Sequence, residues 1–270
     1  MERGKFVKKK WMFLILLSLI SYGIGSGAVQ ADHDDDPPSL RGGSEEDVRN
    51  PDPVSIMELQ MQFPGVVFFQ GDPASNQIAL TFDDGPDPRF TEPILDTLQF
   101  HDVPATFFVM GARAETYPEF LERMDEEGHD VGNHTFWHPN LAEESVEQME
   151  WEVEQTEEVV EDVIGYRPRL FRPPYGNVTV EQTERLAALD NVVIGWSVDS
   201  MDWEQIPAGE IVENVLDHTG GGDIMLMHDG GDWTQEIQTP EALNDVITEL
   251  QEQGYEFVTV STMFDIPREK

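Results

Sequence analysis

The sequence contains no cysteine, so disulfide bonds are excluded and the fold must be held by a hydrophobic core, helped at most by a metal ion. Basic residues are also scarce. The chain has 16 Lys and Arg against 54 Asp and Glu, which gives a formal net charge of −38. Side chains that neutralise phosphate are therefore few, and nucleic acid is not an expected partner.

The charge imbalance grows when the N-terminal segment is set aside. Residues 1–31 hold five basic residues and one acidic residue, so the remainder has 11 basic against 53 acidic residues, a net charge of −42. Lys270 is the only lysine of that remainder. Such self-repulsion destabilises a compact protein unless salt screens it. We interpret the chain as a halophilic or alkali-adapted extracellular protein; an ordinary acidic secreted protein is the alternative.

The long hydrophobic run of the sequence lies at its N-terminus. Residues 1–10 are rich in basic residues, and an uncharged stretch follows from Trp11 to Ala31. Small residues at Val29 and Ala31 favour a cleaved signal peptide over residues 1–31, and a retained membrane anchor is the alternative. Both predict an exported protein of the cell envelope, with no membrane contact by the mature domain unless this segment is retained.

Composition divides the rest of the chain into three parts. Residues 32–74 are predicted to be an acidic linker, rich in Pro and Gly, followed by an N-terminal extension. Residues 75–262 are predicted to form a single catalytic domain, and residues 263–270 a C-terminal tail. The 39% content of hydrophobic residues is typical of a soluble globular protein, and a monomer is expected.

From residue 78 onward, short apolar runs alternate with helical patterns. The predicted strands are residues 78–82, 105–110, 129–133, 169–171, 192–198, 224–227 and 255–260. The predicted helices are residues 91–100, 115–127, 141–164, 179–189, 207–218 and 238–253. This alternation indicates parallel strands joined by helices. Seven strands favour a (β/α) barrel, one unit short of eight, and an open doubly wound sheet is the alternative. The Glu-rich face of the helix over residues 141–164 is interpreted as solvated.

Polar residues directly follow five of the apolar runs. In a β/α barrel such residues meet at the C-terminal rim, where active sites are assembled. They are Asp83 and Asp84; His134 with His138; Arg172, Pro173, Pro174 and Tyr175; Asp199, Asp202 and Trp203; and His228 with Asp229.

The motif HTFWH, with His134 and His138, is the first sign of a metal site. Imidazoles four residues apart can reach one ion, although two structural histidines would show the same spacing. Pro139 disfavours a helix at His138, so the pair is expected on a turn. An Asp from a neighbouring strand end would complete a set of two histidines and one carboxylate. Such a set suits Zn²⁺ and could also hold Fe²⁺, Co²⁺ or Mn²⁺.

The adjacent carboxylates Asp83 and Asp84 suggest a general base. If one of them binds the metal, the other can take a proton from the attacking water. Arg172 could orient that base through a bidentate salt bridge, although a structural ion pair is the alternative.

A general acid is expected at His228. A neighbouring carboxylate would keep its ring protonated and oriented, and Asp202 is the candidate partner. Leu226, Trp203 and Tyr175 could form a small apolar cup, and a backbone N–H near Tyr175 could face a developing oxyanion.

With these residues identified, the chain resembles the polysaccharide deacetylases of carbohydrate esterase family 4, which carry the NodB-homology domain. The motifs TFDDGP, HTFWH, RPPY, DSMDW and LMH occur in the family's order, over about residues 75 to 262. The resemblance implies a distorted (β/α) barrel of the (β/α)7 type and a divalent metal, usually Zn²⁺.

The resemblance also implies a role for each matched residue. Asp83 would be the catalytic base, positioned by Arg172. Asp84, His134 and His138 would be the metal ligands.

The remaining roles belong to the later motifs. His228 would be the catalytic acid with Asp202 behind it. The backbone amide of Tyr175 would help to hold the oxyanion, and Trp203 and Leu226 would line the pocket for the acetyl methyl group.

The sequence thus predicts a hydrolase that removes N-acetyl groups from polymers of N-acetylglucosamine. Peptidoglycan is favoured, and chitin or its oligomers stay open as substrates. An O-acetyl xylan esterase on the same fold is the alternative. A non-catalytic carbohydrate-binding protein and a non-haem iron oxygenase are more remote.

Overall fold

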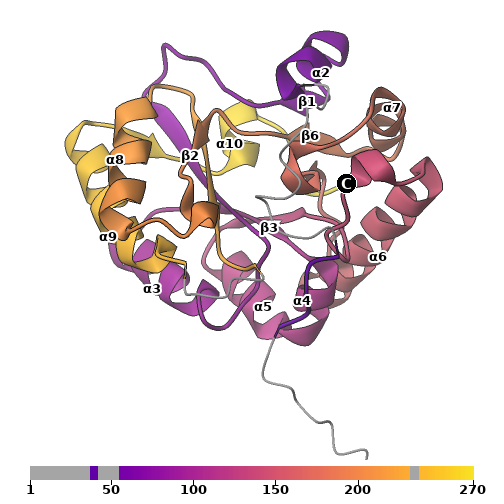
Figure 1. Cartoon of the computed structure of the whole chain (residues 1–270), viewed down its shortest axis with the longest axis horizontal. Coiled ribbons are helices and arrows are strands. Elements are labelled where there is room, and N and C mark those ends of the chain that lie inside the picture. The colour runs from indigo at the N-terminus through magenta and orange to yellow at the C-terminus, as the bar shows by residue number, and fades with distance from the viewer. Residues whose placement is uncertain (1–36, 42–54, 232–236) are drawn as a thin grey trace, which may run out of the picture. The chain divides into compact units, whose positions relative to one another are not determined.

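The computed structural model, drawn in Figure 1, describes residues 37–41, 55–231 and 237–270. Pro37–Lys270 form one compact unit, as expected for a single domain. The predicted signal peptide or anchor (residues 1–31) lies outside the described residues, as does most of the predicted acidic linker. Within the described ranges, every helix is too short or too polar to cross a bilayer.

The described strands form one sheet, and every pairing between them is parallel. Their order is β1-β6-β5-β4-β3-β2-β8-β7, and β9 pairs with β2. The strands are β1 (Val67–Phe68), β2 (Gln77–Asp83), β3 (Thr106–Val109), β4 (Asp130–Asn133), β5 (Leu170–Phe171), β6 (Val192–Ile194), β7 (Val198–Asp199), β8 (Ile224–His228) and β9 (Glu256–Phe257).

Most of the helices lie around the outside of the curled sheet (Figure 1), whereas the last one, Val260–Phe264, packs with Ala79 and Phe108 in a separate hydrophobic cluster. The helices are α2 (Ile56–Gln62), α3 (Thr91–His101), α4 (Gly111–Thr116), α5 (Pro118–Glu126), α6 (Val146–Ile164), α7 (Val180–Ala188), α8 (Ala208–His218), α9 (Thr239–Glu252) and α10 (Val260–Phe264). Among the described strands, β1 and β7 are the two ends of the pairing order. The predicted (β/α)7-type barrel is therefore confirmed in a distorted, half-open form, and the doubly wound alternative is set aside.

The predicted strand over residues 192–198 is divided into β6 and β7. The break falls at Gly195, where a Cβ atom would lie 2.7 Å from Cγ1 of Ile56 in α2. Ile56 and Trp196, the residue after the break, also line the same pocket. Packing against α2 thus interrupts an apolar run that looks continuous in the sequence.

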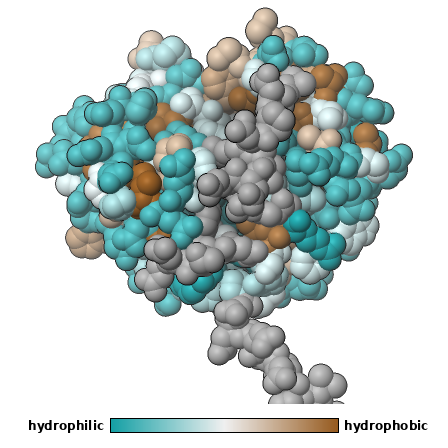
Figure 2. Space-filling model, in the orientation of Figure 1, coloured by the Kyte–Doolittle hydropathy of each residue, from teal (hydrophilic) through white to brown (hydrophobic). Residues whose placement is uncertain are grey.

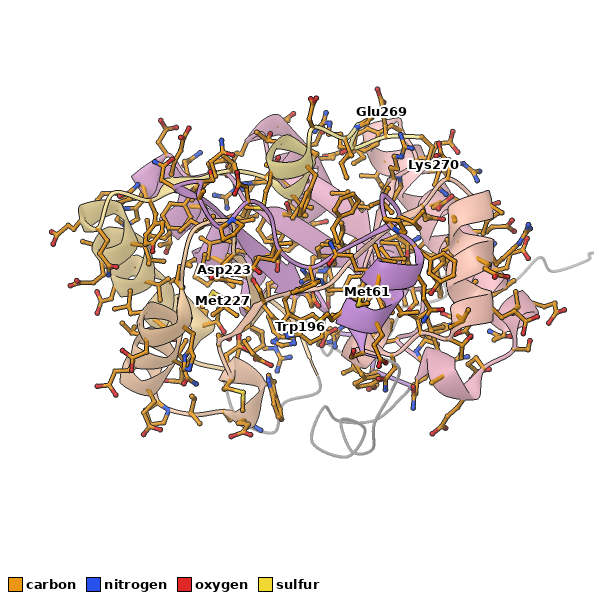
Figure 3. All side chains as sticks on the ribbon, turned by 90° about the horizontal axis from the view of Figure 1, so that it is seen from above. Met61, Trp196, Asp223, Met227, Glu269 and Lys270 are labelled. Carbon is orange, nitrogen blue, oxygen red and sulfur yellow. The ribbon has the colours of Figure 1, made fainter. Side chains whose placement is uncertain are left out.

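Both ends of the domain extend beyond the predicted limits of residues 75 and 262. α2 and β1 lie inside the predicted N-terminal extension, and β1 joins the sheet through β6. At the other end, the predicted strand 255–260 stops at Phe257, and α10 begins at Val260 after the cap of Thr259. Lys270, seen at the chain end in Figure 3, donates to Oε1 of Glu157 at 2.5 Å.

The core lies between the sheet and the helices around it. β2 is buried on both faces, as expected for a central parallel strand. Phe82 of β2 stacks on Phe107 of β3 with 5.1 Å between ring centroids. Together with the apolar faces of α3, α5, α8 and α9, these rings belong to the main hydrophobic cluster, which supports the C-terminal rim from below.

Helix α6 begins later than the predicted residue 141, because Ser145 caps its N-terminus and accepts from Gln148 N–H. It ends at Ile164, and the following Gly165 caps it with φ 85°. The expected solvated Glu face is only partly correct, since Glu152 and Glu157 are buried. Elsewhere hydrophilic residues cover most of the described surface that faces the viewer in Figure 2.

Candidate active site

The strand ends meet at one edge of the sheet, as the sequence predicts. Asp83, the last residue of β2, is the register partner of His228, the last residue of β8. β4 and β5 also end beside each other, so His134 and Arg172, which follow them, lie at the same edge. Parallel register therefore gathers residues that are more than a hundred positions apart in the sequence.

The turn after β2 separates the two adjacent carboxylates. Asp84 adopts φ 72°, a left-handed conformation that is uncommon for a residue other than glycine. The Asp84 carbonyl accepts a hydrogen bond from Nη1 of Arg113 at 3.1 Å. The turn directs the side chains of Asp83 and Asp84 to different partners.

The histidine motif forms an irregular loop, which confirms the expectation of a turn. Thr135 and His138 have φ values of 68° and 56°. Asn133 accepts from the Thr135 N–H at 2.8 Å, and the Thr135 hydroxyl accepts from the His138 N–H at 3.0 Å. These bonds close the loop so that both histidine rings face Asp84.

Asp84, His134 and His138 form a group that could hold a metal ion. One ligand atom from each lies within 4.8 Å of the other two. Nε2 of His134 and Nε2 of His138 lie 3.3 and 3.1 Å from Oδ1 of Asp84. Both Asp84 carboxylate oxygens and the His138 Nε2 are buried without a hydrogen-bond partner, which is costly unless an ion satisfies them. The donor set therefore fits a divalent metal.

The tautomer of His134 supports the same interpretation. Its Nδ1 lies 2.7 Å from the carbonyl oxygen of Arg172, which can only accept, so Nδ1 carries the proton. Nε2 then presents its lone pair toward Asp84. His138 Nδ1 lies 3.1 Å from the hydroxyl of Tyr175, so each ring is held through the nitrogen that faces away from the cluster.

Electrostatics keep the carboxylate of this group ionised. Burial would raise the pKa of Asp84, but His138 and His134 outweigh it and hold that pKa well below its ordinary value. Burial would lower the pKa of His134, but Asp83 and Asp84 outweigh it and raise that pKa. The site thus stabilises positive charge at the point where the three ligand atoms converge.

Asp83 lies beside this group and is held by Arg172. Nη1 of Arg172 donates to Oδ1 of Asp83 at 2.7 Å and to the Thr81 hydroxyl at 2.8 Å. The expected bidentate salt bridge is wrong, because Nε and Nη2 of Arg172 donate to the carbonyls of Ile194 and Gly195. Burial lowers the pKa of this fully buried arginine against the raising effect of Asp83.

His228 is paired with Asp202. Nδ1 of His228 lies 2.7 Å from Oδ1 of Asp202, and the backbone N–H of His228 donates to Oδ2 at 2.8 Å. The Thr239 hydroxyl donates to the same Oδ2. Burial would raise the pKa of Asp202, but His228 outweighs it and lowers that pKa, so the carboxylate is ionised beside the ring.

The residues predicted to contact the acetyl group lie on three separate elements. Tyr175 is buried in the turn after β5 with φ 60°. Leu226 is buried in β8, and its strand neighbour across the register is Asp199. Half-buried Trp203 donates from Nε1 to Oδ1 of Asp199 at 3.1 Å. Asp199 therefore links the strand that carries Leu226 with the indole of Trp203.

Three residues of the site were not predicted. Glu152 accepts from the N–H groups of Phe136 and Trp137 at 2.9 and 2.7 Å and so holds the histidine loop. Arg113 supports the carbonyl of Asp84. Thr91 lies beneath the same turn and contacts Asp229. No local pattern marks Glu152, because it stands among many solvated glutamates of α6.

Asp229 follows His228 at the same strand end, and the sequence predicts that it lies on the rim but predicts no role for it. It is 1% exposed. Burial raises the pKa of Asp229 to about 7; the hydrogen bond from Thr91 opposes this rise, and the charges of Asp84, Asp87 and Asp83 add to it.

The half-barrel and its rim define a class of α/β proteins in which a group that could hold a metal lies beside an Asp–Arg pair and a His–Asp pair. Comparison with known proteins agrees. A family model described as polysaccharide deacetylase matches residues 70–194. A peptidoglycan-N-acetylglucosamine deacetylase of Bacillus cereus is 39% identical over 204 residues, which cover 75% of this chain and 73% of the relative. The chain belongs to the polysaccharide deacetylase family.

Two further similarities place the chain among its relatives. It is 40% identical over 199 residues to the peptidoglycan-N-acetylmuramic acid deacetylase PdaC of Bacillus subtilis, covering 74% of this chain but only 41% of that protein. It also resembles a crystal structure of a peptidoglycan N-acetylglucosamine deacetylase in complex with a 4-naphthalen-1-yl-N-oxidanyl-benzamide. That comparison has a TM-score of 0.72 and 38% identity, and it covers 75% of this chain and 94% of the other.

Proposed function

We propose that the chain is an exported, metal-dependent deacetylase that hydrolyses N-acetyl groups of N-acetylglucosamine polymers, with peptidoglycan as the favoured substrate. The observation that carries this proposal is the presence of three distinct groups of side chains on one rim. A ligand set, a carboxylate paired with an arginine and a histidine paired with a carboxylate lie side by side. The three similar proteins described above are peptidoglycan deacetylases by name, which supports peptidoglycan as the substrate, while a chitooligosaccharide deacetylase of Bradyrhizobium is also 38% identical over 192 residues.

The metal is proposed to be Zn²⁺, held by Asp84, His134 and His138; Co²⁺ or Mn²⁺ would also suit two imidazoles and one carboxylate. When bound, it would supply Lewis acidity that polarises the scissile carbonyl and makes water more acidic. The protein prepares for this by keeping Asp84 ionised and both Nε2 atoms directed at one point.

Asp83 is proposed to accept the proton of the attacking water. The hydrogen bond from Nη1 of Arg172 at 2.7 Å fixes one oxygen of Asp83, while Oδ2 faces the ligand group at 3.7 Å from His134 Nε2. The second oxygen is therefore in the position of a base next to the electrophilic centre.

His228 is proposed to protonate the leaving amine. Asp202 holds Nδ1 and stabilises the charged ring, so that Nε2 can give up its proton when the C–N bond breaks. The left-handed backbone of Tyr175 supports a role for its amide in holding the oxyanion. Trp203 and Leu226 are proposed to enclose the acetyl methyl group.

The cellular setting is proposed from the sequence. The basic and then apolar segment of residues 1–31 supports export to the cell envelope, and the excess of acidic residues supports a halophilic or alkaline habitat. The exported domain is proposed to act as a monomer.

The proposed function is tested by acetate release from a panel of substrates. Peptidoglycan, chitin oligomers and acetylated xylan should be compared, with and without a chelator and at low and high salt. Release from peptidoglycan that stops with the chelator is expected. Release from xylan alone would favour the esterase alternative, and binding of glycan without any acetate release would favour the non-catalytic alternative. Turnover in anaerobic buffer would exclude the oxygenase alternative.

A further inference from the structure

Asp229 lies directly behind the turn that carries Asp83 and Asp84. Its backbone N–H donates to the Asp83 carbonyl at 3.0 Å, and its Oδ1 accepts from the Gly85 N–H at 3.1 Å. Asp229 therefore holds the residues on both sides of Asp84. The contact is tight, because a Cβ atom on Gly85 would lie 2.0 Å from Oδ2 of Asp229.

Thr91 connects this carboxylate to the start of α3. Its hydroxyl donates to Oδ2 of Asp229 at 2.7 Å and accepts from the Asp87 N–H at 2.8 Å. Thr91 and Asp229 are buried, so water does not replace these bonds easily. One hydroxyl thus joins the end of β8, the loop after Asp84 and the first residue of α3.

The turn needs such support because of its backbone conformation. Asp84 adopts φ 72°, which persists in a non-glycine residue only where the surroundings enforce it. Arg113 holds the Asp84 carbonyl on one side, and the contacts of Asp229 with Asp83 and Gly85 hold the other. A small rotation of this turn would move Oδ1 of Asp84 away from the two histidine nitrogens.

We propose that Asp229 and Thr91 are positioning residues, which fix the Asp83–Asp84 turn so that one carboxylate meets the histidines and the other meets Arg172. This inference rests on the proposed function, since it concerns the same metal-binding group. Neither residue belongs to that group, and neither has a role in the proposed proton transfers.

The test compares Thr91→Val, which keeps the shape and removes the hydroxyl, with Thr91→Ser, which keeps the hydroxyl. The full chain is stripped of metal, and Zn²⁺ alone is titrated in competition with a chromophoric chelator. Thr91→Val is expected to weaken Zn²⁺ binding by about tenfold or more, as for other residues that orient metal ligands. Its kcat should fall while KM for a soluble acetylated oligosaccharide stays unchanged, and Thr91→Ser should restore both Zn²⁺ affinity and kcat.

Thr183→Val is the matched control. Thr183 is a buried threonine of α7 whose hydroxyl donates to the Thr179 carbonyl at 2.9 Å. Both Val variants should lower the midpoint of thermal unfolding, but only Thr91→Val should change Zn²⁺ affinity. A folded Thr91→Val protein with the Zn²⁺ affinity of the wild type would overturn the proposal.

Asp229→Ala decides the question if Thr91→Val does not fold. Ala has no acceptor for the Gly85 N–H or for the Thr91 hydroxyl, so weaker Zn²⁺ binding is again expected. Unchanged affinity would overturn the proposal. Because the readout is metal binding, wild-type protein that binds Zn²⁺ but releases no acetate would count against the proposed function and not against this inference.

Discussion

Asp83 and His228 are register partners on adjacent parallel strands. The side chain of Asp83 is paired with a basic group, and that of His228 with an acidic group. Oδ1 of Asp83 lies 2.7 Å from Nη1 of Arg172, and Nδ1 of His228 lies 2.7 Å from Oδ1 of Asp202. The guanidinium fixes one oxygen of Asp83, and the Asp202 carboxylate holds one ring nitrogen of His228. The two strand ends therefore bring the proposed base and the proposed acid side by side at the rim.

Replacing Asp83 by Asn should abolish acetate release, with a loss of about a thousandfold or more, because Asn cannot accept a proton. Metal content measured by elemental analysis should survive, since Asp83 is not in the ligand group. Arg172 would lose its carboxylate partner while buried, so a lower thermal midpoint is also expected.

Asp96→Asn on the exposed part of α3 is the control for the loss of one charge. It should leave turnover and metal content unchanged. Retained turnover in the Asp83→Asn protein would refute the role of Asp83 as base.

Asp202→Asn should change the pH dependence of the reaction. The lowered pKa of Asp202 shows that its charge and the His228 ring stabilise each other against the cost of burial. A neutral Asn removes this support, so the ring should lose its proton at lower pH. The alkaline limb of the kcat/KM profile should therefore move to lower pH, with kcat reduced by about a hundredfold.

Thr239→Val provides the matched comparison, because it removes a hydrogen bond to the same carboxylate and leaves the charge in place. A smaller displacement of the alkaline limb is expected. An Asp202→Asn profile that coincides with the wild type would contradict the assignment of the acid.

The sequence predicted the central strands well because their apolar runs reflect burial on both faces, as in β2 and β8. It missed β1, whose two residues carry too little pattern, and it joined β6 to β7. The break at Gly195 depends on Ile56, which is distant in sequence, so no local signal could reveal it. The predicted helix over residues 115–127 also runs across a boundary, because α4 ends at Thr116 and α5 begins at Pro118, a residue type that favours the start of a helix.

The site was predicted to the extent that its residues follow strand ends. Their positions at one rim come from register, which a barrel imposes on every parallel strand. The supporting residues could not be predicted in the same way. Glu152 and Glu154 are the same residue type on the same helix, but only Glu152 is buried against the histidine loop. Tertiary packing alone makes that distinction.

Removal of the metal should abolish activity reversibly. Dialysis against a chelator should stop acetate release, and Zn²⁺ or Co²⁺ should restore it. His134→Ala should lose bound metal and should not be rescued by added ions at the concentrations that saturate the wild type, because one of three ligands is missing. His101→Ala is the control, since His101 lies at the end of α3 and bonds only to Asn244 among the described side chains. Full metal stoichiometry in His134→Ala would contradict the ligand assignment.

Buried His129 should make stability depend on pH. Its Nδ1 accepts from the Ala105 N–H at 3.0 Å, and burial lowers its pKa from 6.5 to about 4, with Glu127 opposing and Arg123 assisting. Between pH 4 and pH 6.5, His129 is protonated more in the unfolded chain than in the folded one. The contribution of the neutral, buried His129 to the free energy of unfolding is therefore fully present above pH 6.5 and is lost as the pH falls toward 4. The loss should reach about 2 kcal/mol at pH 5.

The measurement is the free energy of unfolding in urea at several pH values and constant salt. His129→Gln is the comparison, because its amide oxygen can still accept from Ala105 but cannot titrate. The difference between wild type and variant isolates His129 from the many surface carboxylates. A difference that does not vary between pH 5 and pH 7 would contradict the assignment.

Salt should stabilise the folded domain. Residues 32–270 carry a net charge of −42, and the Debye length falls from about 10 Å at 0.1 M salt to about 3 Å at 1 M. Repulsion between surface carboxylates should therefore weaken, and the thermal midpoint should rise with NaCl at saturating metal. Glu154→Lys with Glu158→Lys, two exposed positions of α6, should stabilise the protein at low salt and lose that advantage at high salt. A midpoint that does not change with salt would remove the physical basis for a halophilic habitat.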